Sequence, residues 1–307
     1  MSPPKHPARF GDVTQPAIEP RGAPMPLVTQ PMIPVPIDGD GDPSATRHDR
    51  PLATLKSDAA VRFGKPTQAM VTAGAPQPQQ LAPIGPPPEI GLTQHHLPEE
   101  PPDPRLALVL DPDSERSAAF RVLRHHLLEV GRPQVVVVSS PQPGDGKTTT
   151  AVNLALALAE CGRARVLLVE TNLRRPQLSG VFKLLPPWCF AEQLAAHRHQ
   201  PMMPWSLIEI PQLWLHVGAI NPRIEKTQLL DGPAFAIAME RLRLGGYDHI
   251  VVDAPPVLGS ADVNLMADAA DAVMFAVRAR SSTTRDLRRA IEQLGDQKFV
   301  GAVLVQD

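Results

Sequence analysis

Residues 139–160, SSPQPGDGKTTTAVNLALALAE, decide the fold. They continue the β-branched run at 134–140, which is typical of a short strand buried on both faces of a sheet. Gly144 and Gly146 form a turn, and an alanine- and leucine-rich helix is predicted from Lys147. Glycines let backbone N–H groups turn inward around an anion, and the positive end of the helix adds to the attraction. The stretch therefore predicts a phosphate-binding loop.

The order strand, loop, helix favours a nucleotide site over the alternative, an ordinary surface turn. The full motif has glycine at the position of Pro141, so the match is incomplete there. Lys147 is predicted to reach the β- and γ-phosphates, and the Thr148 hydroxyl to bind Mg²⁺. The predicted nucleotide-binding residues are Pro143, Gly144, Asp145, Gly146, Lys147, Thr148 and Thr149.

Apolar strands alternate with helices along residues 105–307, which predicts an α/β fold with a mostly parallel sheet and helices on both faces. The predicted strands are 134–140, 164–170, 213–219, 248–256, 271–279 and 299–306. The predicted helices are 114–130, 147–160, 233–244 and 283–295. Asp253 ends the strand at 248–256 and is predicted to bind Mg²⁺ with Thr148, the alternative being a carboxylate that caps a turn.

Composition divides the chain in two. Of the 37 prolines, 23 fall in residues 1–104, and proline lacks the N–H that helices and sheets need. We predict a disordered Pro-rich region at 1–104 and one P-loop domain at 105–307. The Pro-rich region is either a solvated linker or a docking peptide. A net charge of −2 gives no basic field that would attract nucleic acid or anionic lipid. The two cysteines do not make a disulfide framework and favour a reduced, cytoplasmic setting, and the lack of an 18-residue apolar run predicts no membrane span.

Three segments resemble one family: residues 139–159, VLLVETNLRRP at 166–176 and YDHIVVDAPPVLGSADVNLMADAADAVMFAVRA at 247–279. They are similar to the kinase domain of bacterial tyrosine kinases that control capsule and exopolysaccharide synthesis. That family belongs to the deviant-Walker P-loop ATPases, alongside the partitioning ATPases. The resemblance covers about 111–307 and implies ATP and Mg²⁺. Partitioning ATPases have a signature lysine where this chain has Gln142, which favours the kinases.

The chain departs from the family at the second Walker strand, where Glu170-Thr171-Asn172 stands in place of Asp-x-Asp. The resemblance implies Lys147, Glu170 and Asp253 as catalytic residues. Glu170 keeps the negative charge but extends it by one methylene, whereas Asn172 brings no charge. One weakened charge-assisted contact slows phosphoryl transfer about ten- to a hundredfold, so we expect slow turnover.

Other departures concern assembly, base binding and substrate. The family's oligomerisation helix has Glu three residues before two arginines; here the positions are Ala118, Arg121 and Arg124. The family's adenine-contacting Asn corresponds to Val305. Tyr247 is the one tyrosine of the chain, and it is predicted to pack against the sheet rather than to accept phosphate.

These features predict an ATP-binding, tyrosine-kinase-like regulator of capsular or exopolysaccharide biosynthesis or export, with a degenerate second Walker motif. One alternative is a non-catalytic, nucleotide-gated scaffold of an export complex. Another is a partitioning-type ATPase that binds DNA through Arg278, Arg280, Arg285, Arg288 and Arg289. The expected partner is a membrane chain-length regulator or activator that holds the protein peripherally at the inner membrane. Homo-oligomers fit the family, and nucleic acid is not an expected partner.

Overall fold

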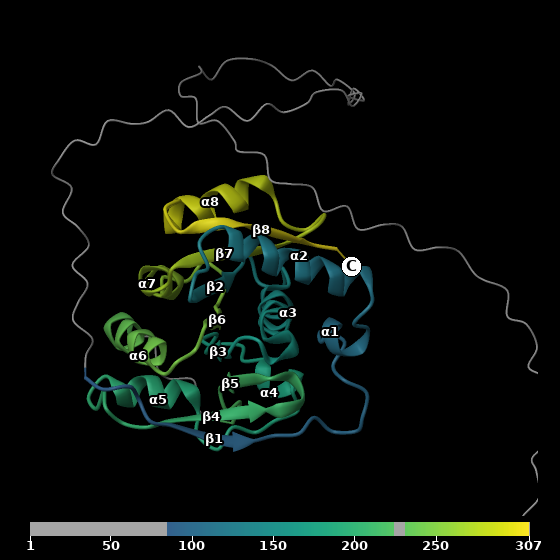
Figure 1. Cartoon of the computed structure of the whole chain (residues 1–307). Coiled ribbons are helices and arrows are strands. Elements are labelled where there is room, and N and C mark those ends of the chain that lie inside the picture. Colours follow the sequence, from purple (N-terminus) through teal and green to yellow (C-terminus); the bar gives the residue numbers. More distant parts are fainter. Residues whose placement is uncertain (1–84, 224–230, 307) are drawn as a thin grey trace, which may run out of the picture.

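The computed structural model describes residues 85–223 and 231–306 (Figure 1). In these ranges the chain forms one eight-stranded sheet with helices on both faces. The strand order is β1-β4-β5-β3-β6-β2-β7-β8, and only β4 and β5 run antiparallel to each other. The predicted α/β class with a mostly parallel sheet is therefore confirmed.

The strands are β1 (Ile90–Gln94), β2 (Val135–Ser139), β3 (Val166–Glu170), β4 (Trp205–Ile210), β5 (Leu215–Gly218), β6 (His249–Asp253), β7 (Ala272–Arg278) and β8 (Phe299–Val305). The helices are α1 (Ala107–Leu110), α2 (Glu115–Glu129), α3 (Lys147–Ala159), α4 (Leu178–Val181), α5 (Phe190–His197), α6 (Gly232–Leu244), α7 (Asp262–Ala269) and α8 (Thr284–Leu294). Every strand and helix that we predicted is present, within a few residues of its predicted ends.

The central strands β2, β3 and β6 are buried along their whole length, because helices cover both of their faces. One apolar core joins the sheet to α5, α6 and α7, and a second core joins its other face to α1, α2, α3 and α4. Burial of this apolar surface is the main force that stabilises the fold. In the described part of the chain, no helix has the length and apolar character needed to cross a bilayer.

Helix α3 is the most enclosed helix of the described structure, with 12 of its 13 residues buried. It begins directly after the loop that follows β2, and it packs against β2, β3 and β6. The loop at 140–146 is therefore held between a buried strand and a buried helix. This arrangement gives the phosphate-binding loop a rigid frame.

The folded unit begins earlier than predicted. Strand β1 lies inside the range 1–104 that we predicted to be disordered, and it pairs in parallel with β4 over five residues. The prediction was wrong for 85–104, because Ile90–Gln94 contains no proline and its N–H groups can join a ladder. Residues 1–84 lie outside the described residues.

The prediction also missed β4 and the short helices α1, α4, α5 and α7. Helices α5 and α7 have eight residues each, too few to be stable without tertiary packing. Strand β4 is the one that pairs antiparallel with its neighbour, which the alternation of strands and helices does not predict.

Candidate nucleotide-binding site

Three neighbouring strands end at the same edge of the sheet. Strands β3, β6 and β2 are adjacent and parallel, and the register pairs Glu170 with Asp253 and Asp253 with Val138. In open parallel sheets ligands bind beyond this carboxyl edge. The loop after β2 lies at this edge, so the structure brings Glu170 and Asp253 to the predicted phosphate loop.

The phosphate loop has the geometry of an anion site. Gly144 and Gly146 both have φ of 91°, a left-handed conformation that glycine adopts without strain. The buried Asp145 carboxylate accepts hydrogen bonds from the Gln142 N–H at 3.0 Å and from the Ser282 hydroxyl at 2.8 Å. No described residue accepts a hydrogen bond from the N–H groups of Gly144, Asp145 or Gly146. These donors, together with the start of α3, can bind a phosphate.

Lys147, Thr148 and Asp253 lie together at the start of α3. The Thr148 hydroxyl donates to Asp253 Oδ2 at 2.8 Å, and Lys147 Nζ lies 3.9 Å from Asp253 Oδ1. That Oδ1 is buried and accepts no hydrogen bond from the described residues. Burial raises the pKa of Asp253, whereas Lys147 acts in the opposite direction. A hydroxyl beside a carboxylate oxygen that accepts no hydrogen bond fits Mg²⁺, which needs few protein ligands when phosphates and water supply the rest.

Glu170 has different contacts from those expected of a catalytic carboxylate. Its side chain is buried, and Oε1 accepts hydrogen bonds from the backbone N–H groups of Gln177 and Leu178. Oε2 accepts a third from the Ile220 N–H at 3.0 Å. Burial raises the pKa of Glu170 to about 7, although the three backbone donors favour the charged form. Both oxygens are thus engaged with the loop after β3 and the segment after β5.

Thr171 and Asn172 continue from Glu170 into that loop. The N–H and the hydroxyl of Thr171 both donate to the Asp253 carbonyl at 3.0 Å. Asn172 is 5% exposed and adds no charge. The second Walker strand therefore offers the site one carboxylate that is already hydrogen-bonded and one neutral amide.

Strand β8 ends against the phosphate loop. A Cβ at Gly146 would lie 3.1 Å and 3.2 Å from the two methyl carbons of Val305. Glycine therefore allows Val305 to pack closely on the loop. The position at which the resemblance implied a contact with adenine has an apolar side chain that forms no hydrogen bond.

Sequence reasoning missed three residues around the site: Ser282, Gln177 and Arg105. Ser282 lies 137 residues from its partner Asp145, and nothing local distinguishes it from the serine and threonines around it. Gln177 binds Glu170 through its backbone N–H, and a pattern of side chains in a sequence cannot indicate such a contact. Arg105 donates to the Gln177 side chain from the region predicted to mark the domain boundary.

Comparison with known proteins gives relatives but no matching family model. The chain is 30% identical over 190 residues to the putative tyrosine-protein kinase EpsB of Ralstonia solanacearum, covering 60% of this chain and 24% of that protein. It is 28% identical over 206 residues to the succinoglycan biosynthesis transport protein ExoP of Rhizobium meliloti (strain 1021), covering 62% and 25%. It is 28% identical over 200 residues to the tyrosine-protein kinase YwqD of Bacillus subtilis (strain 168), covering 63% and 82%. The chain thus spans about a quarter of the first two relatives.

Two solved structures have the same fold. The chimerical protein CapA2B2 gives a TM-score of 0.56 at 26% identity, covering 71% of this chain and 93% of that one. The BceF tyrosine kinase domain gives a TM-score of 0.53 at 25% identity, covering 65% and 81%. The fold is that of a P-loop NTPase. Among these proteins, the chain is related to the bacterial tyrosine kinases, and the predicted resemblance is confirmed.

Proposed function

We propose that this chain is an ATP-binding, tyrosine-kinase-like protein that regulates capsular or exopolysaccharide biosynthesis or export, with slow phosphoryl transfer or ATP hydrolysis. The observation that supports this most strongly is the contact between Thr148 and Asp253, whose other carboxylate oxygen faces Lys147 and accepts no hydrogen bond from the described residues. The relationship to tyrosine kinases supports the activity, and the relationship to a succinoglycan transport protein supports the process.

Nucleotide binding follows from the free donors of the loop. The N–H groups of residues 144–146 bind the phosphate oxygens, and the Lys147 ammonium offsets the charge of the terminal phosphates. Thr148 and Asp253 would hold Mg²⁺, which supplies positive charge to the phosphoryl group during transfer. Lys147 and Asp253 are thus the residues that we place in the catalytic machinery.

Slow turnover follows from the second Walker strand. Glu170 is held by three backbone N–H groups, so we propose that it acts by positioning the loop after β3. Asn172 cannot accept a proton or add charge. The same observation favours a second candidate, a nucleotide-gated scaffold that binds ATP without hydrolysing it. The two candidates share the binding site and differ in turnover.

A membrane protein is the proposed partner, because the described residues contain no spanning helix and ExoP is named as a transport protein. We propose a cytoplasmic protein that a chain-length regulator or activator recruits to the inner membrane. Fractionation of cells with and without the gene for that membrane protein tests the recruitment. Recovery of the chain in the soluble fraction of both strains would contradict it.

The nucleotide site is tested by titrating a fluorescent ATP analogue with Mg²⁺ into the full chain. We expect Lys147→Ala to weaken binding at least about tenfold, because it removes a charge-assisted contact. Lys298→Ala is the matched control, since among the described residues Lys298 donates to the carbonyls of Ala267 and Asp268 and to no group of the site. Equal affinity of the wild type and Lys147→Ala would refute the site. ATP binding without any Lys147-dependent hydrolysis would favour the second candidate, the nucleotide-gated scaffold, over the slow enzyme.

A further inference from the structure

The N-terminal segment 85–106, which we call the strap, lies along one edge of the sheet and then runs toward α1 (Figure 1). Its first part is fixed by β1, by the Arg241 guanidinium, which donates to the Pro86 carbonyl at 2.6 Å, and by the His95 ring, 3.0 Å from the Phe182 carbonyl. The strap thus connects an edge of the sheet to the region of α4.

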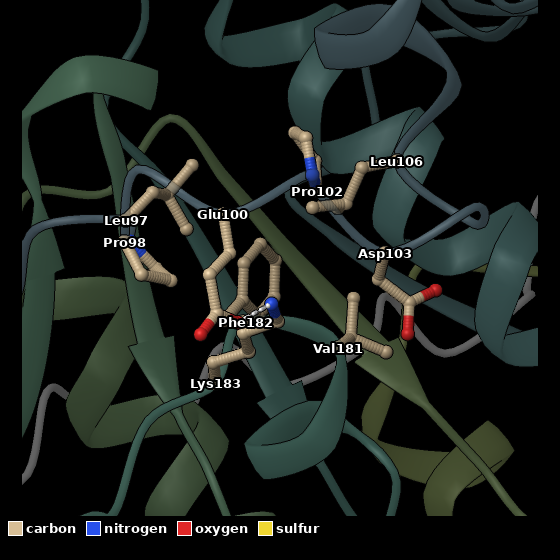
Figure 2. Close-up of a pocket in the computed structure, with 9 residues that line it drawn as sticks. All are labelled: Leu97, Pro98, Glu100, Pro102, Asp103, Leu106, Val181, Phe182 and Lys183. Carbon is tan, nitrogen blue, oxygen red and sulfur yellow. Dashed lines mark hydrogen bonds and ion pairs between the residues drawn. The ribbon is translucent and has the colours of Figure 1, made fainter.

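The second part of the strap packs against α4 and the residues after it. Figure 2 shows the small pocket where this happens, with Leu97, Pro102 and Leu106 of the strap near Val181 and Phe182. An ion pair of 2.6 Å between Lys183 Nζ and Glu100 closes one side. These contacts hold the end of the strap beside the loop at 171–177 that precedes α4.

Arg105 extends from the strap to that loop. Its Nε and Nη2 donate to the two oxygens of Asp103 at 2.8 Å and 2.7 Å, and its Nη1 donates to Gln177 Oε1 at 2.9 Å. The Arg105 carbonyl accepts a hydrogen bond of 2.6 Å from the Asn153 amide of α3. Arg105 is therefore oriented from two sides before it reaches Gln177.

Gln177 is held at both its side chain and its backbone. Arg105 binds the side-chain oxygen, and Glu170 accepts the backbone N–H. At the other end of the loop, Thr171 is bonded to the Asp253 carbonyl. The segment at 171–177, which contains Asn172, is thus fixed between Asp253 at one end and the Glu170–Gln177–Arg105 connection at the other.

We propose that Arg105 is a positioning residue for phosphoryl transfer, acting through Gln177 on the loop at 171–177. This inference rests on the proposed function, because it concerns the turnover at that site. Three of the five N–H bonds of the Arg105 guanidinium are directed at Asp103 and Gln177, and these contacts are the reason that we assign Arg105 to positioning the loop. The strap then contributes to turnover through a single side chain.

The test compares Arg105→Ala, Arg105→Lys and Gln177→Ala with Arg116→Ala, an exposed arginine on α2, as the control. Each variant of the full chain is assayed for affinity for the ATP analogue and for steady-state ATP turnover. The third measurement is the rate of tryptic cleavage between Arg174 and Arg175, two exposed residues of the loop. Near-native melting curves of Arg105→Lys and Gln177→Ala show whether the fold is kept.

We expect Arg105→Ala and Gln177→Ala each to lower kcat about fivefold with affinity changed by less than about twofold. Arg105→Lys is expected to behave like Arg105→Ala, since one ammonium cannot bind Asp103 and Gln177 in a fork. The double variant Arg105→Ala/Gln177→Ala is expected to lose no more than either single one, as for residues acting through one contact. Cleavage at the loop is expected to accelerate in all three single variants and not in Arg116→Ala.

Wild-type kcat and cleavage in Arg105→Ala, or additive losses in the double variant, would overturn the proposal. A wild-type chain that binds ATP but shows no turnover contradicts the enzymatic form of the proposed function and, with it, this role in phosphoryl transfer. In that case the cleavage rates still report whether Arg105 orders the loop. The failure of the positioning role and the failure of the proposed activity are therefore distinguished by the same set of variants.

Discussion

Glu170 and Asn172 are two residues apart, yet we expect substitution of Glu170 to lower stability and substitution of Asn172 to raise turnover. Glu170→Asp shortens the side chain, so it cannot keep three backbone hydrogen bonds, and we expect a loss of about 2 kcal/mol in the free energy of unfolding. Asn172→Asp adds a negative charge at almost unchanged size, and we expect ATP turnover to rise about tenfold. Urea denaturation and steady-state hydrolysis measure the two effects. A gain in turnover from Glu170→Asp alone would show that the carboxylate acts in catalysis directly.

Tyr247 is placed where phosphorylation cannot reach it in the folded protein. It is 2% exposed, and its hydroxyl lies 2.8 Å from His216 Nδ1. The Arg165 guanidinium lies 5.2 Å from the centre of its ring, and burial raises the pKa of Tyr247. We expect no phosphate on Tyr247 after incubation with ATP and Mg²⁺, as mapped by mass spectrometry. Stoichiometric phosphate that disappears in Lys147→Ala would contradict this.

Glu160 binds both arginines that the family resemblance associates with oligomerisation. Arg121 Nη2 lies 2.6 Å from one of its oxygens and Arg124 Nη1 lies 3.1 Å from the other. The hydrogen bond from Arg121 lowers the pKa of Glu160 below its ordinary value of 4.5. Its contribution to stability is therefore present above pH 4.5 and is lost as the pH falls through the lowered pKa.

The expected result is a wild type more stable than Glu160→Gln by about 1 kcal/mol at pH 7. The difference should shrink as the pH is lowered from 5 to 3, as followed by urea denaturation. A difference that is constant over this range would mean that the charge of Glu160 contributes nothing and that only packing differs.

Among the elements, the contribution of β1 to stability can be tested with proline substitutions, because the backbone N–H groups of successive residues point alternately toward β4 and away from it. The N–H of His95 donates to the Glu209 carbonyl of β4. Alternate residues bond in a parallel ladder, so the Thr93 N–H faces β4 and the Leu92 N–H faces away from it. We expect Thr93→Pro to cost about 3 kcal/mol, whereas Leu92→Pro should cost clearly less. Thermal unfolding of both variants measures this, and equal melting temperatures would mean that β1 does not contribute through its ladder.

The elements also show which parts of the fold and site were predictable. Strands β2 and β6 and helix α3 follow from contiguous apolar runs and the glycines between them, which are local signals. Strand β1 depends on β4, whose residues follow 115 positions later, and the role of Glu170 depends on Ile220. The proximity of Lys147, Thr148 and Asp253 could be predicted, because their side-chain types and their positions after two buried strands indicate a phosphate and metal site. Contacts to backbone N–H groups cannot be predicted in this way, because every residue except proline has such a group.

At the scale of the molecule, the nucleotide is expected to stabilise the sheet as a unit. The residues of the site come from the β2–α3 connection and from the end of β6, which lie at the centre of the sheet. A ligand at about 100 times its Kd adds about 2.7 kcal/mol, and we expect the melting temperature to rise by roughly 5–10 °C with ATP and Mg²⁺. Lys147→Ala should show no such rise in differential scanning calorimetry. Stabilisation of both proteins alike would indicate binding elsewhere.

Strand β1 must wait for its partner strand during synthesis on the ribosome. It is the first of the described strands to emerge, yet the partner of Ile90 is Trp205, so more than a hundred residues must be made before the two can pair. Such a distant contact closes late and slowly, because the intervening chain must first be ordered. Until then the strand has an unpaired edge, with Leu92 available to neighbouring nascent chains. The prolines at 86–88 and at 98 flank it on both sides, and since proline interrupts pairing they limit how far a wrong partner could extend.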